Sequence, residues 1–139
     1  METFELRNYK GQVYRFQLEN VLIVFLPTVS SKLDKEHLLL LKKQMKAITK
    51  HVKNLFVIVH QNEEDISKVL KKKNFPFPIL ADSKARIAKQ LQCYLLPIGI
   101  VQRSSFLYGI NGTLLFRKTF MSNIEEHFEF LSTTPKMNK

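Results

Sequence analysis

The sequence predicts an α/β fold in which helices flank a central mixed sheet, and three observations predict it. Residues 21–26 and 55–60 form apolar runs rich in β-branched residues, which are typical of strands buried on both faces. The segment between them has helical periodicity, so strand, helix and strand form a βαβ unit with parallel strands. Residues 99–120 contain two strand-like runs joined by a turn at residues 109–112, which indicates an antiparallel hairpin.

The first elements follow from hydrophobic periodicity. Phe4, Leu6 and residues 12–18 alternate apolar and polar side chains around Gly11, which predicts a short N-terminal β-hairpin. From residue 32 to about residue 52 the apolar side chains recur at steps of three and four. This pattern predicts one amphipathic helix of several turns, and its apolar positions are Leu38, Leu41, Met45, Ile48 and Val52.

The later elements have start and stop signals. Residues 63–74 begin with acidic and end with basic side chains, which matches the dipole of a short helix. Residues 75–80 are broken by prolines and then extended. In residues 82–91 an aspartate and a serine precede an apolar-periodic run, so we expect a capped helix beginning near Ser83. Residues 123–131 predict a last helix.

This order of elements is that of a thioredoxin-like domain. The chain of 139 residues is long enough for one hydrophobic core. We expect a single domain over residues 1–132 and a frayed tail over residues 133–139. No apolar run approaches the roughly 20 residues of a membrane-spanning helix, and the first residues lack the apolar core of a signal peptide. We therefore expect a cytoplasmic protein without a membrane partner.

Cysteine and histidine usage restricts the chemistry. Cys93 is the one cysteine, so an internal disulfide and a zinc site built from cysteines are both excluded. The four histidines have no metal-ligand spacing and are interpreted as scattered; they are His37, His51, His60 and His127. No metal or cofactor is expected.

The net charge of +10 makes an acidic partner worth considering. The lysines lie mainly on predicted helices, where such residues usually form a solvated face. Nucleic-acid-binding proteins usually add arginines, exposed aromatic side chains or a recognisable module. Nucleic acid is therefore disfavoured as a partner and remains only a weaker alternative.

Four segments carry a resemblance to a known family. They are "FELRNYKGQVYRFQL", "VLIVFLP", "FPFPILADSKARIAKQL" and "RSSFLYGINGTLLF", and together they span most of residues 4–120. These segments resemble the peroxiredoxins, the alkyl hydroperoxide reductase and thiol-specific antioxidant (AhpC/TSA) family, which includes the bacterioferritin-comigratory proteins. The resemblance implies a thioredoxin-like fold of the peroxiredoxin type and an antioxidant oxidoreductase activity.

The active loop of that family has a proline, a threonine or serine four residues later, and the peroxidatic cysteine three residues further. The corresponding positions here are Pro27, Ser31 and Asp34, so the nucleophile is missing. Arg103 stands where the family places an arginine that helps to hold the thiolate and the peroxide. Gly109 departs from the family, which usually has an aspartate at that position of the hairpin.

The same loop has a purely structural interpretation. Ser31 and Asp34 fit the serine-x-x-acid pattern of a helix start, with Ser31 as the N-cap. Asp34 would then be a fixed anion at the helix N-terminus, paired with Arg103. The alternative is a retained ligand pocket around Asp34 and Arg103. For Arg103 we expect a structural pairing with Asp34 or Glu36.

Three functions remain open on this sequence. The first is a peroxiredoxin-like protein without peroxidase activity that acts by binding, as a homodimer or with a protein partner. The second is a thiol peroxidase or other oxidoreductase that uses Cys93 and an external reductant. Cys93 lies at the end of a predicted helix within an apolar run, and both features raise a thiol pKa, so a buried hydrophobic role is favoured. The third is the nucleic-acid-associated protein.

Overall fold

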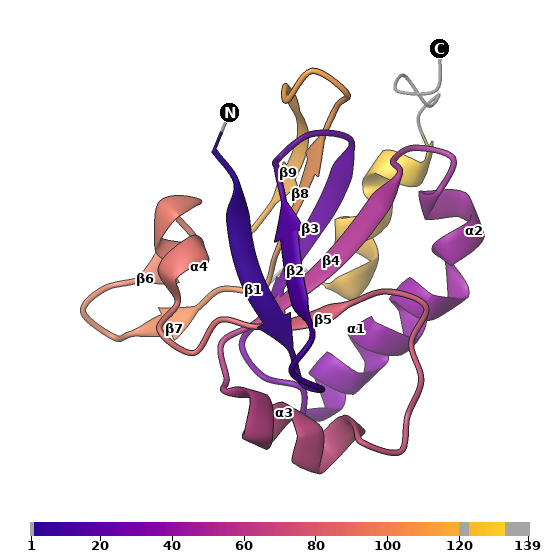
Figure 1. Cartoon of the computed structure of the whole chain (residues 1–139). Helices are drawn as coiled ribbons and strands as arrows, with labels where there is room; N and C mark the ends of the chain where they lie inside the picture. The colour runs from indigo at the N-terminus through magenta and orange to yellow at the C-terminus, as the bar shows by residue number, and fades with distance from the viewer. Residues whose placement is uncertain (1, 120–122, 133–139) are drawn as a thin grey trace.

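The computed structural model describes residues 2–119 and 123–132 (Figure 1). Its central sheet has seven strands in the order β2-β1-β5-β4-β3-β8-β9. Strand β3 (Val21–Leu26) pairs in parallel with β4 (Asn54–Val59) and antiparallel with β8 (Ser104–Tyr108). The sheet is therefore mixed, as predicted.

The predicted N-terminal hairpin is confirmed. Strands β1 (Phe4–Asn8) and β2 (Val13–Phe16) pair antiparallel, with Phe4 opposite Phe16. The side chain of Asn8 closes the turn, because its Oδ1 accepts hydrogen bonds from the backbone N–H groups of Lys10 and Gln12, both at 2.9 Å. Strand β1 then joins the rest of the sheet through β5 (Ile79–Ala81).

The single helix predicted from residue 32 to about residue 52 is wrong in one respect. The structure has two helices, α1 (Lys32–Lys43) and α2 (Met45–Ile48), separated at Gln44, whose φ of −93° and ψ of 8° leave the α-helical region. The apolar periodicity does not reveal the break, because the apolar residues on both sides of it reach the same core. The next helix, α3 (Glu63–Leu70), is capped by the side chain of Asn62.

The fourth helix begins later than predicted. Helix α4 comprises Arg86–Gln90 with Ala85 as its N-cap residue, rather than beginning near Ser83. The carboxylate of Asp82 accepts hydrogen bonds from the backbone N–H groups of Arg86 at 2.9 Å and Ile87 at 3.0 Å. A turn at Ala85, with φ of 54°, carries the chain from this carboxylate into the helix. The predicted last helix is present as the 3₁₀ helix η1 (Ile124–Ser132).

The late hairpin is confirmed as β8 and β9 (Leu114–Lys118), but the predicted first strand was too long. Residues before β8 instead form β7 (Ile100–Val101), which pairs with β6 (Tyr94–Leu95) in a separate two-stranded sheet. Strands of two residues are too short to show an alternating pattern. Phe120, at the end of the predicted hairpin, and the predicted tail lie outside the described residues.

The core has two parts, one on each face of the sheet. Consecutive residues of β3 alternate between them, because side chains of a strand point to opposite faces. Leu22 packs with Leu38 and Leu41 of α1, whereas Ile23 packs with Ile87 and Ala88 of α4. Helices therefore cover both faces. Within the described part of the chain, no helix has the length and apolar character to cross a membrane.

Candidate functional site

The loop that follows β3 enters α1 through a complete capping box. Pro27, half-buried, ends the strand, and Ser31 is the N-cap of α1. The Ser31 hydroxyl accepts a hydrogen bond from the backbone N–H of Asp34 at 3.0 Å, and Asp34 Oδ2 accepts one from the backbone N–H of Ser31 at 3.3 Å. The predicted helix cap is confirmed.

Asp34 is a buried carboxylate with several donors. Only 1% of the residue is exposed. Oδ1 accepts a hydrogen bond from Nη2 of Arg103 at 2.5 Å, and Oδ2 accepts a second, from the hydroxyl of Thr28, besides the Ser31 contact. Hydrogen bonds to the charged form stabilise a buried anion. The predicted pairing of Asp34 and Arg103 is confirmed, while the contribution of Thr28 was missed.

Arg103 connects Asp34 to a histidine one turn further along α1. The guanidinium lies before β8, is only 9% exposed, and places Nη1 at 2.9 Å from Nδ1 of His37. A guanidinium can only donate, so Nδ1 of His37 is the acceptor and the ring proton is on Nε2. Burial, and then the charge of Arg103, lower the pKa of His37 to about 3. His37 is therefore neutral beside the ion pair.

A second buried histidine, His127 of η1, lies against the first. The ring centroids of His37 and His127 are 5.2 Å apart, and Nδ1 of His127 lies 2.8 Å from the hydroxyl of Ser105 on β8. Burial, and then the charge of Arg103, lower the pKa of His127 to about 4. The interpretation of the histidines as scattered is wrong for this pair. The sequence indicated only that His37 lies near Asp34, because a three-residue step places both on one helix face.

These residues form a polar cluster, which we define as Thr28, Asp34, His37, Arg103, Ser105 and His127. Its charges balance, and its Asp and His side chains are almost fully buried. Nothing in the cluster is both nucleophilic and exposed. Among the described residues no group of three or more His, Cys, Asp or Glu side chains could hold a metal ion. Through these contacts the cluster connects α1 with β8 and η1.

The structure does not bring Cys93 to this cluster. Cys93 is fully buried with Phe25 and Phe106 on the α4 face of the sheet, whereas α1 packs on the other face. Its Sγ lies 3.6 Å from the backbone oxygen of Ala88. Burial is the main cause that raises the pKa of the Cys93 thiol to about 12. At neutral pH a thiol with this pKa is protonated, which disfavours nucleophilic attack.

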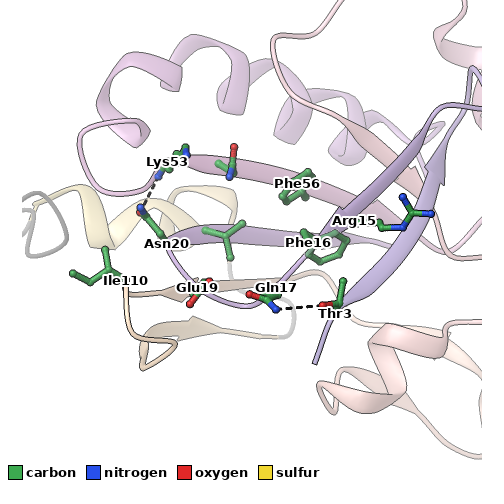
Figure 2. Close-up of a pocket in the computed structure, with 11 residues that line it drawn as sticks. Thr3, Arg15, Phe16, Gln17, Glu19, Asn20, Lys53, Phe56 and Ile110 are labelled. Carbon is green, nitrogen blue, oxygen red and sulfur yellow. Dashed lines mark hydrogen bonds between the residues drawn. The ribbon is translucent and has the colours of Figure 1, made fainter. Parts of the chain in front are cut away.

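A surface cavity of about 540 Å³ lies at the opposite end of β3 from Pro27 (Figure 2). Phe16 and Phe56 line it, with their rings stacked at 4.7 Å between centroids. Two polar lining groups are already occupied, since Asn20 accepts a hydrogen bond from the backbone of Lys53 and Gln17 donates one to Thr3. This cavity has no connection with the candidate site.

Comparison with known families identifies the chain. The model of the AhpC/TSA family matches residues 1–117. The chain belongs to the AhpC/TSA family. The resemblance inferred from the sequence is therefore confirmed. A comparison with curated proteins found no match.

Solved structures of peroxiredoxins share the fold of this AhpC/TSA member. Peroxidoxin BcpB from Mycobacterium tuberculosis matches with a TM-score of 0.83 and 16% identity, over 100% of this chain and 95% of that one. The bacterioferritin comigratory protein of Xanthomonas campestris matches with a TM-score of 0.80 and 14% identity, over 93% of this chain and 88% of that one. AhpC from Enterococcus faecalis matches with a TM-score of 0.75 and 16% identity, over 94% of this chain and 87% of that one. The predicted thioredoxin-like fold of the peroxiredoxin type is confirmed.

Proposed function

We propose that this member of the AhpC/TSA family has no peroxidase activity and acts by binding. The observation that carries the proposal is the environment of Asp34. This carboxylate stands at the position where the family motif has its peroxidatic cysteine. Arg103, Thr28 and the backbone of Ser31 all donate to it. Its surroundings therefore suit a hydrogen-bonded carboxylate that pairs with Arg103.

The chemistry of peroxide reduction supports this view. A thiolate sulfur attacks one peroxide oxygen, the O–O bond breaks, and a hydroxide leaves. The resulting sulfenic acid is then reduced by thiols. A carboxylate cannot enter such a cycle. Asp34 resembles in charge and shape the over-oxidised sulfinate form of a cysteine. Unlike a cysteine, its side chain does not change charge or shape through a redox cycle.

Cys93 does not replace the missing nucleophile. Reaction requires an accessible thiolate, whereas this sulfur is 0% exposed and its pKa is raised to about 12. A fold whose one thiol is buried is better suited to recognition than to thiol-dependent turnover. We extend the proposal to a cytoplasmic protein that forms a homodimer or binds another partner.

A peroxide-consumption assay with a thiol reductant tests the loss of peroxidase activity. We expect the same rate for the wild-type protein, for Cys93→Ser and for buffer. A wild-type rate above buffer that disappears in Cys93→Ser would show that the protein is a Cys93-dependent enzyme. A rate that persists in Cys93→Ser would also contradict the proposal, and would locate the activity outside the only thiol of the chain.

A further inference from the structure

The hairpin formed by β6 and β7 carries a concentrated apolar surface. Leu96 is 76% exposed, Ile98 is 71% exposed and Ile100 is 47% exposed, and Pro97 between them is also exposed. We call these four residues the apolar tip. Single exposed apolar side chains are ordinary, but branched side chains gathered on one protruding turn are typical of an interaction site.

The apolar tip is held on a well-anchored base. Tyr94 pairs with Val101 and Leu95 with Ile100, and the backbone N–H of Gly99 closes the turn by donating to the oxygen of Leu95 at 2.7 Å. At the base, Cys93 and Val101 are buried in the core of the α4 face. Figure 1 shows α4, β6 and β7 projecting together from one side of the sheet. The tip is therefore displayed on a fixed support.

The segment that carries the tip has only one sign of charge. Residues 83–124 contain no aspartate and no glutamate. Lys84, Arg86 and Lys89, on and just before α4, are exposed. The ammonium group of Lys89 lies 5.0 Å from the ring centroid of Tyr94, at the base of the tip. The side chains thus progress from aliphatic at the tip, through an aromatic–lysine pair, to a basic helix.

From this arrangement we propose that the apolar tip inserts into the surface of an anionic lipid bilayer. Aliphatic side chains partition into the acyl region, an amphipathic tyrosine and a lysine suit the headgroup level, and basic residues are attracted to anionic headgroups. The cytoplasmic leaflet supplies such a negative surface. The orientation would place α4 next to the headgroups and the central sheet away from them.

Two other occupants fit the observations less well. A second copy of the chain at the tip would bring together two proteins that each carry a net charge of +10, which is unfavourable. Near α4 the carboxylate of Glu2 already accepts a hydrogen bond from Gln90, and that of Asp82 accepts from the backbone of Arg86 and Ile87. A protein partner usually meets an interface rich in tyrosine, tryptophan and arginine, whereas the exposed positions of the tip are aliphatic. A lipid surface accommodates both the charge and the composition.

The proposal revises the expectation that no membrane is a partner. That expectation concerned spanning helices, and binding to a bilayer surface does not need one. The inference deepens the binding role proposed above and rests on it. The two can fail separately, since the peroxide assay depends on Cys93 and the lipid assay on Leu96 and Ile98.

Co-sedimentation with vesicles tests the proposal. The full chain is mixed with vesicles of phosphatidylcholine alone or of phosphatidylcholine with phosphatidylserine, at low and high salt. We expect sedimentation with the phosphatidylserine vesicles, decreasing as salt screens the charges. Leu96→Ser combined with Ile98→Ser should lower the partition coefficient at least about tenfold. Lys84→Gln combined with Lys89→Gln should lower it by a similar factor, about tenfold or more.

Matched variants control for general loss of apolar surface or charge. Leu39→Ser removes another exposed leucine, 60% exposed on α1. Lys46→Gln with Lys50→Gln removes two exposed lysines near α2. Both controls should sediment like the wild type, and circular dichroism should show that every variant is folded.

Three outcomes would overturn the proposal. The first is no sedimentation with either vesicle. The second is sedimentation that the tip variants do not change. The third is light scattering that shows a dimer lost in Leu96→Ser with Ile98→Ser, without vesicle binding, which would assign the tip to a second copy.

Discussion

Asp34 Oδ1 and Arg103 Nη2 form an ion pair at 2.5 Å in which neither partner is exposed by more than 9%. The pair joins the first turn of α1 to the residue before β8, so it connects segments that are distant in the sequence. His37 accepts the second guanidinium contact at 2.9 Å. The loop that resembles the peroxidase motif in sequence therefore holds a buried ion pair that links α1 to the start of β8.

Removal of the Asp34 charge should destabilise the fold strongly. In Asp34→Asn the buried guanidinium of Arg103 loses its counter-charge, and we expect a loss of about 3 kcal/mol in the free energy of unfolding. Urea denaturation measures it. Glu5→Gln is the matched control, because the Arg15–Glu5 pair at 2.7 Å is more than half exposed and should contribute less than about 1 kcal/mol. Equal losses in the two variants would contradict the structural role of the cluster.

A cysteine placed at Asp34 should have a depressed pKa. In a Cys93→Ser background, Asp34→Cys places the only thiol at a helix N-terminus beside an unpaired Arg103, and both stabilise the thiolate. The absorbance of the thiolate, followed against pH, should give a pKa well below about 8.5. Ser30→Cys in the same background supplies an exposed thiol of the same loop. A pKa at position 34 no lower than at position 30 would show that the loop is not a preserved anion site.

Acid should destabilise the protein through its buried histidines. The folded-state pKa values of His37 and His127 are lowered to about 3 and about 4, from an unfolded value of 6.5. The unfolded chain therefore binds more protons as the pH falls from 6.5 towards 4, and stability present above pH 6.5 is lost in that window. At pH 5 each of these two histidines should lower the free energy of unfolding by about 2 kcal/mol. Burial also lowers the pKa of His51, which adds to the loss.

The variant His37→Asn separates one contribution to this pH dependence. Its side-chain oxygen can still accept the hydrogen bond from Arg103, but it does not titrate. The slope of the free energy of unfolding against pH, between pH 4 and 6.5, should fall by about 1.4 kcal/mol per pH unit. An unchanged slope would mean that His37 does not remain neutral in the folded state.

A glycine after α4 should stabilise the fold. Gln92 has a φ of 63° and completes a C-terminal cap, in which its N–H donates to Lys89 and that of Cys93 donates to Ala88. A side chain in this left-handed region costs about 1 kcal/mol, which glycine avoids. Thermal unfolding of Gln92→Gly should therefore show a higher midpoint than the wild type. Gln90→Gly, inside the helix, should lower it, and a lower midpoint for both would refute the strain at Gln92.

The sequence predicted well what local patterns encode. The strands β3 and β4 follow from continuous apolar runs, and the helix cap follows from the three-residue step between Ser31 and Asp34. The pairing of Asp34 with Arg103 was predictable only because the resemblance aligned two distant segments. Local patterns did not show the break at Gln44, since core packing continues across it.

The histidine pair could not be predicted, for a different reason. His37 and His127 meet because η1 packs beside α1, and no periodicity within either segment reports that approach. The β6–β7 hairpin was missed because its strands are too short to alternate. Its exposed tip follows the apolar run around Cys93, for which burial of Cys93 alone was predicted.

The sealed position of Cys93 also determines how this protein can associate. Glutathione, a thioredoxin or a second chain could form a mixed disulfide only after α4 had separated from the sheet, because the sulfur has no exposed surface. A complex of the folded protein is therefore not held by a disulfide through Cys93, and its stability should not depend on the oxidation of that sulfur.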